Sequence, residues 1–356
     1  MRLVNIDQVT EEMTLAKPLY DSRGMLILPL GSALMPHREQ LTRLNVQHLH
    51  VNDRFSEGIE MSHLLSEDTR IEIYETVRKL KQIYKRVEDH KKKTFYDFPY
   101  MKLGKKITED IMSQGGVNID ITELVMNRIY DHDHELNVGI LSALIGRAFG
   151  MTSDNVFNMC LGGFLHDIGL LALPEEIMAK FGKTPMDAVD LMTYRQYPMM
   201  GFDMVRNNQV LNIMTKSAML QHKERFDGTG FPGKKQGDEI SQAAKIVAVA
   251  NSFEKHFFGR DPEHGEMNVL EVVKYILKST GSAYDPAVVQ EFVRYLVIFP
   301  NGTTVKLSDG STAVVESQNA GKMVKPVVRV IGADNKSWER LDLVSSNLSV
   351  ENMISL

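Results

Sequence analysis

Cysteine is almost absent from this chain, which has a single residue of this type, Cys160, among 356. One cysteine excludes a disulfide framework within the chain and is consistent with a reducing compartment. The chain also lacks any run close to the ~20 apolar residues that a membrane-spanning helix needs. Its N-terminus has no apolar signal core. We therefore expect a cytoplasmic protein that is not inserted in a membrane.

An excess of charge of one sign is also missing, because 41 Lys and Arg residues face 46 Asp and Glu residues and the formal net charge is -5. This balance argues against a general DNA-binding protein, although a local basic patch can still hold a small phosphate ligand. The hydrophobic share of 43% and the charged share of 24% are close to those of an average globular protein. The length favours two or three domains.

The hydrophobic patterns predict a mainly α fold in which small units flank a central helical domain. Three β-hairpins are expected, one within 15–30 and two near the C-terminus, at 303–316 and 325–344. The expected helices of the central domain are 101–113, 121–130, 134–149, 156–165, 186–207, 211–222, 241–258 and 269–279. The expected domains are an α+β unit at 1–64, a connecting helix at 65–100, the helical domain at 101–298 and a β module at 299–356.

A long charged segment from Ser66 to about Lys93 carries the pattern of the connecting helix, with Ser66 as its N-cap. Its apolar and aromatic residues recur at helical spacing; they are Ile73, Val77, Leu80, Tyr84 and Val87. Such a stripe is consistent with pairing to a second copy in a homodimer. It is equally consistent with a helix that packs on its own chain.

The dipeptide His166-Asp167 stands where a buried apolar helix is expected to end, since Leu165 precedes it and Gly169 follows. Neighbouring side chains diverge by about 100° in a regular helix, but at a helix end they can converge on one ion. Imidazole and carboxylate together suit a divalent transition metal. A histidine that caps a helix end is the alternative interpretation.

The segment from His222 to Pro232 is the most specific pattern in the chain. It contains Arg-x-Asp-Gly-x-Gly-aromatic-Pro, with a histidine three residues before the arginine. Its glycines predict a tight turn with an exposed backbone. The alternative is a plain glycine-rich loop that only ends a helix.

Taken in order, these segments resemble the HD-GYP family of bacterial cyclic di-GMP phosphodiesterases. The family series is a first His, then His-Asp-x-Gly-Lys, His-Pro-x-x-Gly, His-His-Glu-Arg-x-Asp-Gly-x-Gly-Tyr-Pro, and an Asp after an Ala-rich apolar run. The resemblance covers roughly residues 120–298, and the flanking units resemble accessory parts of some members. It implies an all-helical HD-type domain, a metal-dependent hydrolase activity and iron or manganese as cofactor.

Half of the key positions of this family are retained. The resemblance implies His134, His166, Asp167 and His222 as metal ligands, with Asp167 and His166 as the catalytic pair of an active enzyme. It implies phosphate-contacting roles for Arg225 and Arg260, and we expect Lys223, which departs from the family pattern, to take part in ligand binding as well. The retained loop comprises Asp227, Gly228, Gly230 and Pro232, with Phe231 in place of the family's Tyr.

The other half is changed. Leu170 replaces the Lys after His-Asp-x-Gly, Tyr197 replaces the His before Pro-x-x-Gly, Lys223 replaces the second His of the pair, and Asn251 replaces the last Asp. A protonated lysine has no lone pair for a metal, and an asparagine oxygen is a weaker ligand for a transition metal than a carboxylate. A tyrosine would have to ionise first, with an ordinary pKa near ~10.

These changes lead to a hypothesis about the site. We expect Lys223 to occupy the metal cavity and to pair with Asp167, so that the site holds little or no metal; its alternative position is in solvent. One divalent ion, Fe or Mn, remains compatible with the four-residue set of the wider HD superfamily, in which Asn251 would be the weak member. That set is His134, His166, Asp167 and Asn251.

The expected function is therefore that of a degenerate HD-GYP protein of cyclic di-GMP signalling. Loss of ligands or of their supporting groups typically costs orders of magnitude in activity. We expect a receptor for the dinucleotide, or an adaptor that binds a signalling protein such as a cyclic-dinucleotide synthase. The alternatives are a phosphodiesterase with residual activity and a dimeric structural scaffold.

Overall fold

The computed structural model describes residues 1–20, 25–44, 46–60, 64–87, 99–121, 133–180, 186–261, 264–319, 322, 324–334 and 336–354. The chain divides into two compact units. Unit 1 comprises Met1–His63, Asp120–Met126 and Leu296–Leu356, and unit 2 comprises Leu64–Ile119 and Asn127–Tyr295. Two of the expected boundaries, 64 and 298, lie close to the limits of these units, and the helix expected at 65–100 belongs to unit 2. The division into four domains remains a prediction.

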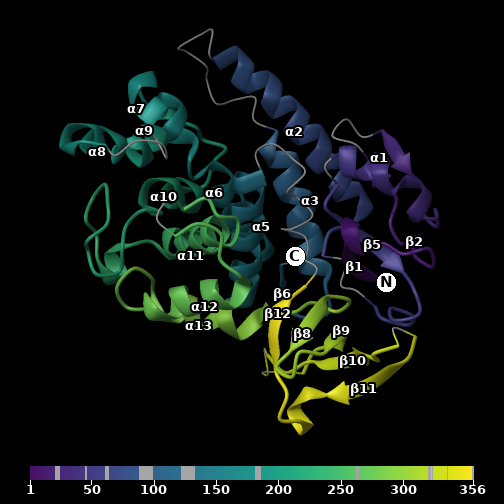
Figure 1. The fold of residues 1–356 in the computed structure, drawn as a ribbon. Helices are drawn as coiled ribbons and strands as arrows, with labels where there is room; N and C mark the ends of the chain where they lie inside the picture. Colours follow the sequence, from purple (N-terminus) through teal and green to yellow (C-terminus); the bar gives the residue numbers. More distant parts are fainter. Residues whose placement is uncertain are drawn as a thin grey trace. The chain divides into compact units, whose positions relative to one another are not determined.

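Unit 1 contains two main sheets and a short hairpin (Figure 1). The first sheet has the strand order β1-β5-β2, and its strands are β1 (Arg2–Asn5), β2 (Thr14–Leu15) and β5 (His48–Asn52). The expected hairpin near the N-terminus is confirmed by the pairing of β3 (Leu19–Tyr20) with β4 (Leu26–Leu28), although residues 21–24 of its turn lie outside the described residues. The short helices are η1 (Ile6–Gln8), η2 (Met35–His37) and α1 (Arg38–Arg43).

The C-terminal sheet has five strands in the order β11-β10-β9-β8-β12. They are β8 (Thr304–Leu307), β9 (Thr312–Ser317), β10 (Val327–Ile331), β11 (Trp338–Asp342) and β12 (Val350–Met353), and η7 (Leu343–Ser345) lies between the last two. Both expected C-terminal hairpins are confirmed. The sequence pattern did not predict β12, which pairs with β8.

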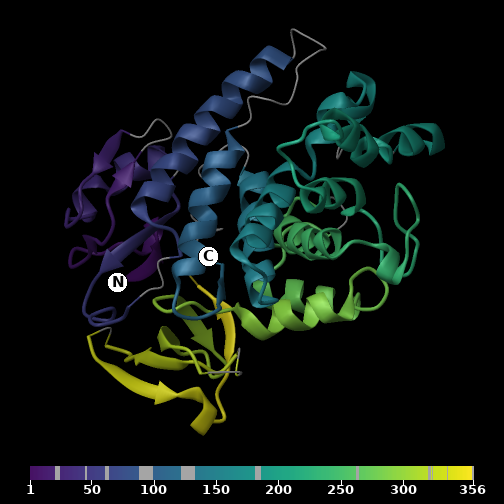
Figure 2. The same ribbon diagram turned by 180° about the vertical axis from the view of Figure 1, so that it is seen from behind.

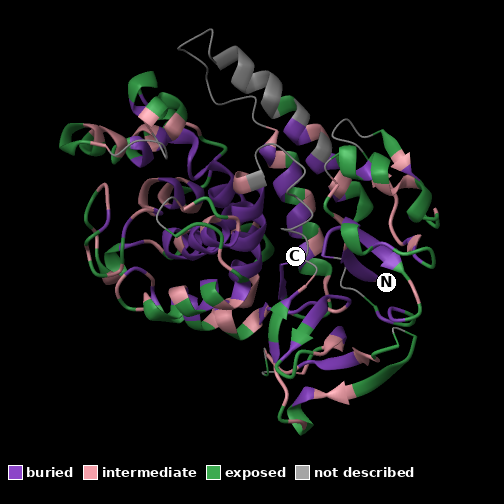
Figure 3. Ribbon diagram, in the orientation of Figure 1, coloured by how far each residue is buried: buried purple, intermediate pink, exposed green. Residues whose placement is uncertain are grey.

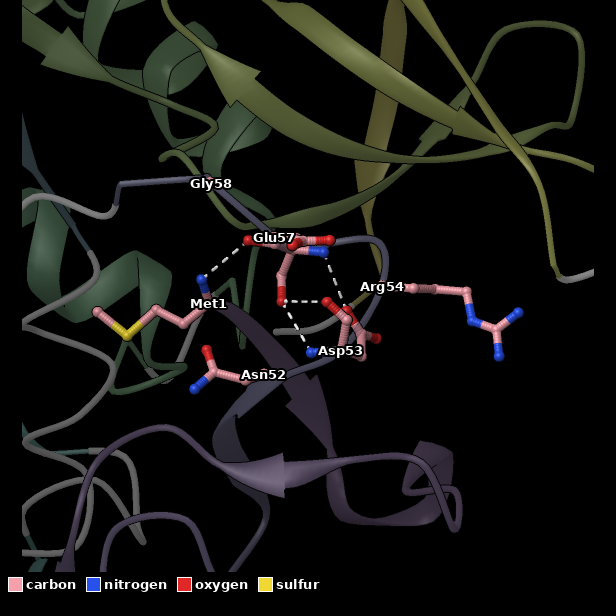
Figure 4. Close-up of a pocket in the computed structure, with 7 residues that line it drawn as sticks. Met1, Asn52, Asp53, Arg54, Glu57 and Gly58 are labelled. Carbon is pink, nitrogen blue, oxygen red and sulfur yellow. Dashed lines mark hydrogen bonds between the residues drawn. The ribbon is translucent and has the colours of Figure 1, made fainter.

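A buried arginine joins the two sheets of unit 1. Arg2 donates to Asp53 from Nε (2.8 Å) and to the Thr304 hydroxyl from Nη1 (2.9 Å). Figure 4 shows a pocket lined by Met1 and by residues of the segment 52–58, which follows β5. Here the Met1 ammonium donates to the Ser56 carbonyl oxygen (3.1 Å). Because the Arg2 and Asp53 side chains are both buried, this ion pair ties the start of β1 to the end of β5.

Unit 2 is helical and confirms the expectation of a mainly α fold. Its helices are α2 (Glu67–Val87), α3 (Tyr100–Ser113), α5 (Asp133–Ala148), α6 (Ser153–Leu165), η5 (Ile168–Ala172), α7 (Glu175–Lys180), α8 (Ala188–Tyr194), α9 (Tyr197–Val205), α10 (Ile213–Gln221), η6 (Gly237–Glu239), α11 (Gln242–Phe257), α12 (Val269–Lys278) and α13 (Pro286–Tyr295). The strands β6 (Ile119–Asp120) and β7 (Leu296–Val297) are short. Helices α5, α6, α10 and α11 pack against one another at the centre of this unit, which Figure 2 shows from behind. Figure 3 shows that much of this centre is buried.

Three helix ends show where sequence reasoning worked and where it failed. Ser66 caps α2 as expected, since its hydroxyl accepts the backbone N–H of Thr69 (3.3 Å). The single helix expected over 186–207 was wrong: α8 and α9 are separate, because Pro198 lies in the first turn of α9, where a missing N–H is tolerated. Helix α13 was not expected, although Asp285 caps it through the Val288 N–H (3.2 Å). The helix expected at 121–130 falls mostly outside the described residues.

Helix α2 packs against α3, and Ile73 and Val77 are buried. This favours a helix that packs on its own chain over the first half of the stripe, and the homodimer remains a prediction. No helix within the described ranges is long and apolar enough to cross a membrane.

Two glycines allow α5 and α6 to approach closely. A Cβ on Gly163 would lie 2.6 Å from the Cα of Gly139 and 2.6 Å from the Val138 carbonyl oxygen. Only hydrogen side chains fit at this crossing. The close approach brings the start of α5 next to the end of α6.

Replacing Gly163 with alanine is expected to destabilise the fold by about 1–3 kcal/mol or more, because the added methyl group meets backbone atoms that cannot rotate away. Urea unfolding followed by circular dichroism measures the change. The matched control is Gly115→Ala, where nothing lies within 4 Å of the new Cβ; its effect should stay below about 1 kcal/mol. Equal effects at both glycines would contradict the close-packing argument.

Candidate metal centre

Three side chains converge where α5 begins and α6 ends. His134 lies in the first turn of α5, His166 is the C-cap of α6, and Asp167 precedes η5. Asp167 Oδ2 lies 3.2 Å from His166 Nε2 and 3.5 Å from His134 Nε2, and the two imidazole nitrogens are 3.3 Å apart. The helix end thus lets the two consecutive side chains His166 and Asp167 meet at one point, as the sequence pattern indicated.

The ring orientation of two histidines is set by backbone carbonyl groups. His166 Nδ1 donates to the Gly163 oxygen (2.7 Å), and His222 Nδ1 donates to the Met219 oxygen (2.9 Å). Each neutral ring therefore presents the lone pair of Nε2 to Asp167. Such a hydrogen bond on the remote nitrogen is the usual support of a metal-bound histidine.

The three ligand atoms have the spacing that one ion requires. Two ligands that are each ~2.1 Å from a tetrahedral metal lie about 3.4 Å from one another. The three separations among His134, His166 and Asp167 are 3.2 to 3.5 Å. All three atoms are acceptors when the histidines are neutral, so a cation between them relieves their mutual repulsion. The residues therefore fit one divalent transition metal.

Asn251 adds a fourth candidate ligand from α11. The residue is 3% exposed, and its side-chain oxygen has no hydrogen-bond partner among the residues that the structure describes. A buried carbonyl oxygen without a partner is costly. Asn251 precedes Lys255 by four positions on α11, which places the two on one face of the helix, and Lys255 reaches Asp167.

Tyr197 occupies the other side of the carboxylate. Its hydroxyl donates to Asp167 Oδ1 (2.8 Å) and lies 2.8 Å from His222 Nε2, which is itself 3.1 Å from Asp167 Oδ1. Burial and the charge of Asp167 raise the pKa of Tyr197 well above its usual range, so the hydroxyl stays protonated. Tyr197 is fully buried and lines the site rather than closing it from outside.

The lysine that contacts Asp167 is not the expected one. Lys255 of α11 lies 3.5 Å from Asp167 Oδ2, whereas no ion pair joins Lys223 to this carboxylate among the described residues. The direct ion pair expected between Lys223 and Asp167 is not formed in the part of the chain that the structure describes; Lys223 lies beside Lys255 and interacts electrostatically with Asp167 at longer range. Desolvation and the neighbouring Lys255 charge lower the pKa of Lys223 to about 7. Sequence reasoning missed Lys255, although its position four residues after Asn251 was a usable signal.

The environment of Asp167 strongly favours the ionised form of its carboxyl group. Burial acts to raise the pKa of this carboxyl group, but His166, Lys255 and His134 outweigh burial and hold the pKa well below its usual range. Burial also lowers the pKa of His222 to about 4. The centre thus combines one carboxylate with a neutral His222 at pH 7.

A second buried carboxylate supports His134. Glu254 of α11 accepts a hydrogen bond from His134 Nδ1, and it also accepts from Arg260 Nε (3.0 Å) and from Asn137 Nδ2 (3.5 Å). Glu254 is fully buried. No signal in the sequence singled out Glu254. The sequence also predicted that Arg260 contacts phosphate. In the structure Arg260 instead donates to Glu254, and Glu254 orients the His134 ring. The phosphate role of Arg260 remains a prediction.

The loop from His222 to Pro232 is held by its own polar groups. Buried Glu224 accepts the backbone N–H groups of Gly233 (2.6 Å) and Lys235 (3.1 Å). A Cβ on Gly230 would lie 2.3 Å from the Arg225 nitrogen, so this position requires glycine. Asp227 accepts the Thr229 hydroxyl (2.6 Å) and Gly228 has a positive φ of 81°.

The outer end of the loop does not reach the His–Asp cluster. The Phe231 ring packs on Tyr194 and Tyr197, and Pro232 follows it through a cis peptide bond. The Arg225 side chain is 46% exposed, with its Nε 4.0 Å from Asp227. Leu170, in place of the family's lysine, packs into the apolar cluster around Tyr197.

Removing the charge of Lys255 is expected to strengthen metal binding. Lys255→Met deletes an ammonium 3.5 Å from a metal-facing oxygen, and a gain of at least tenfold in affinity, about 1.4 kcal/mol, is expected. Isothermal titration of the metal-free protein with Mn²⁺ measures it. The control is Lys278→Met on the exposed end of α12. Unchanged or weaker binding in Lys255→Met would show that Lys255 does not compete with the ion.

Unit 2 contains most of the segment that matches a known protein family. Residues 116–288 match the family model described as HD domain. The chain is 28% identical over 225 residues to the cyclic di-GMP phosphodiesterase PA4108 of Pseudomonas aeruginosa, covering 63% of this chain and 53% of that protein. It is 32% identical over 164 residues to a cyclic di-GMP phosphodiesterase of Thermotoga maritima, covering 46% of this chain and 44% of that protein.

The chain spans about half the length of these curated relatives. Among solved structures, it is similar to Bd1817, described as an HDG"Y"P protein from Bdellovibrio bacteriovorus. That similarity has a TM-score of 0.46 and 16% identity, and covers 82% of this chain and 97% of the other. The family resemblance inferred from His166-Asp167 and the glycine-rich loop is confirmed.

Proposed function

We propose that this chain is a non-hydrolytic relative of the HD-GYP cyclic di-GMP phosphodiesterases that binds a cyclic dinucleotide as a receptor. The match of residues 116–288 to the HD domain family model and the similarity to cyclic di-GMP phosphodiesterases support this proposal. The chain's own residues would hold one divalent iron or manganese ion at His134, His166, Asp167 and Asn251. Such an ion supplies Lewis acidity toward a phosphate oxygen.

One observation carries the proposal: both oxygens of Asp167 already have protein partners. Oδ1 accepts the Tyr197 hydroxyl, and Oδ2 faces His134, His166 and Lys255. A carboxylate that bridges two ions must offer one oxygen to each. The Tyr197 hydroxyl lies against both Asp167 Oδ1 and His222 Nε2, so these two groups would not be free to hold a second ion. With room for one ion, the pair of metals that the family's chemistry needs is incomplete.

Binding of the dinucleotide is supported by retained arginines. The guanidinium of Arg225, on the loop that begins at His222, is 46% exposed, and arginine is well suited to bidentate phosphate contacts. Lys255 adds a positive charge 3.5 Å from Asp167, and Lys223 lies near Lys255. A phosphate ligand therefore finds cations without requiring a second metal.

The test combines hydrolysis and titration with cyclic di-GMP, each with and without Mn²⁺ or Fe²⁺. We expect saturable binding, no turnover above the rate of metal alone, and at least tenfold weaker binding in Arg225→Ala. The matched control is Arg294→Ala, which removes an arginine that is 63% exposed on α13. Metal-dependent turnover would support the residual phosphodiesterase instead, and absence of both binding and turnover would support the scaffold.

An adaptor role is the second candidate, favoured by the surface of α8. Tyr194 of this helix packs on Phe231, while Val189 and Met192 are 73% and 69% exposed. Large exposed apolar side chains beside the loop are typical of a protein interaction surface. Binding of a purified signalling partner that is lost in Met192→Asp, with cyclic di-GMP binding intact, would distinguish this role from the receptor.

A further inference from the structure

A second cluster of histidine and aspartate lies where α11 ends. His256 stands in the last turn of α11, and Asp261 and His264 follow on the segment that leads to α12. His264 Nδ1 lies 3.0 Å from Asp261 Oδ1, and His256 Nε2 lies 3.8 Å from Asp261 Oδ2. One ligand atom from each of the three residues lies within 4.8 Å of the others.

The orientation of His256 is the decisive feature. Its Nδ1 donates to the Ser252 carbonyl oxygen (2.8 Å), so a neutral ring directs the lone pair of Nε2 toward Asp261. His256 is only 4% exposed, and its Nε2 has no hydrogen-bond partner in the described part of the chain. A buried ring nitrogen without a partner carries a desolvation cost that a bound cation removes.

A simple His–Asp hydrogen bond does not explain the whole cluster. It accounts for His264 and Asp261, which are 3.0 Å apart, but leaves the buried Nε2 of His256 without a function. The two imidazole nitrogens lie 3.0 Å from Oδ1 and 3.8 Å from Oδ2 of the same carboxylate, near the value of about 3.4 Å expected for two ligands of one tetrahedral ion. The ring of Tyr275, 4.1 Å from that of His256, fixes the imidazole plane.

We propose that His256, Asp261 and His264 form a second metal site, which binds a zinc-like divalent transition ion. Two imidazoles and one carboxylate suit such ions better than Mg²⁺ or Ca²⁺. The side chains of Asp261 and His264 are 26% and 35% exposed, which leaves the outer coordination position to water. This site is separate from the cluster at Asp167 and does not depend on cyclic dinucleotide binding.

The ion would stabilise the connection between α11 and α12. The Met267 N–H donates to the His256 carbonyl oxygen (3.0 Å), and the Arg260 N–H donates to the Lys255 oxygen (2.7 Å). A metal that joins His256 to Asp261 therefore holds the backbone next to Arg260. Arg260 contacts Glu254, which supports His134. The second site would therefore stabilise the segment that carries Arg260, and through Glu254 it would support the position of His134 in the main cluster.

Titration with Co²⁺ tests the proposal, because its visible absorption reports coordination by nitrogen and oxygen ligands. Tag-free, chelator-treated protein carrying His134→Ala and His166→Ala removes the main cluster as a source of signal. We expect this variant to bind one cobalt ion per chain. Adding His264→Ala should weaken that binding at least tenfold, whereas adding His37→Ala, a partly exposed histidine elsewhere, should leave it unchanged.

Two results would overturn the proposal. The first is that the double variant, with a native circular dichroism spectrum, binds no cobalt. The second is that His264→Ala binds cobalt as tightly as its parent. To cover a folding failure of the double variant, zinc titration of the otherwise native chain compares His264→Ala with His37→Ala. The loss of one bound ion in His264→Ala alone is expected, and an unchanged stoichiometry counts against the site.

Discussion

Replacing Asp167 with alanine is expected to cost about 3–5 kcal/mol of stability and to abolish metal binding at the main cluster. Asp167 is buried, and its two oxygens face His134, His166, His222, Tyr197 and Lys255. Without the carboxylate, the Lys255 ammonium loses its counter-charge and the Tyr197 hydroxyl loses its acceptor. Both losses raise the free energy of the folded state, because water cannot easily enter this buried site to solvate the unpaired ammonium and hydroxyl groups.

Urea unfolding at pH 7 measures the stability term, and titration with Mn²⁺ measures the loss of metal. Asp203→Ala is the matched control, because that side chain is 52% exposed on α9 and pairs only with Arg206 among the contacts described. Its effect should stay within about 0.5 kcal/mol. If Asp167→Ala were as stable as the control, the polar cluster would not be a determinant of the fold.

Replacing Tyr197 with histidine is expected to raise the number of ions bound at the main cluster from one to two. The substitution removes the hydroxyl that takes up Asp167 Oδ1 and supplies an imidazole beside His222 Nε2. Asp167 Oδ1, His222 Nε2 and the new imidazole would then be available to hold a second ion. Affinity at this position should rise by at least about 100-fold over the native chain, the scale of a lost or gained ligand and its support. Elemental analysis of the dialysed protein measures the stoichiometry.

Tyr197→Phe is the control for this prediction. It also removes the hydroxyl but supplies no ligand, so the number of ions should stay at one. It should cost about 1–3 kcal/mol of stability, because the buried Asp167 carboxylate loses the hydroxyl that donates to it. A second ion in both variants would mean that the hydroxyl only blocks space, and a second ion in neither would refute the one-ion argument.

Local patterns in the sequence were enough for much of the fold. Helical spacing and N-caps such as Ser66 predicted most helices of unit 2, since capping depends on residues three positions apart. Alternation and turn residues predicted the three hairpins. Two errors concerned helix boundaries. The helical pattern over 186–207 hid the break that Pro198 makes between α8 and α9, and the N-cap Asp285 at the start of α13 was overlooked.

The same distinction applies to the site. By itself, the sequence was enough for the resemblance to the HD-GYP family, the His166-Asp167 pair and the loop ending at Pro232, because these depend on residue types at short spacing. The tertiary structure alone decided which cation meets Asp167, since Lys223 and Lys255 lie on different elements and only Lys255 is 3.5 Å away. It also placed the Tyr197 hydroxyl between Asp167 and His222, which come from three separate segments. The number of ions that fit depends on these distances, and distances between remote segments follow from packing rather than from spacing along the chain.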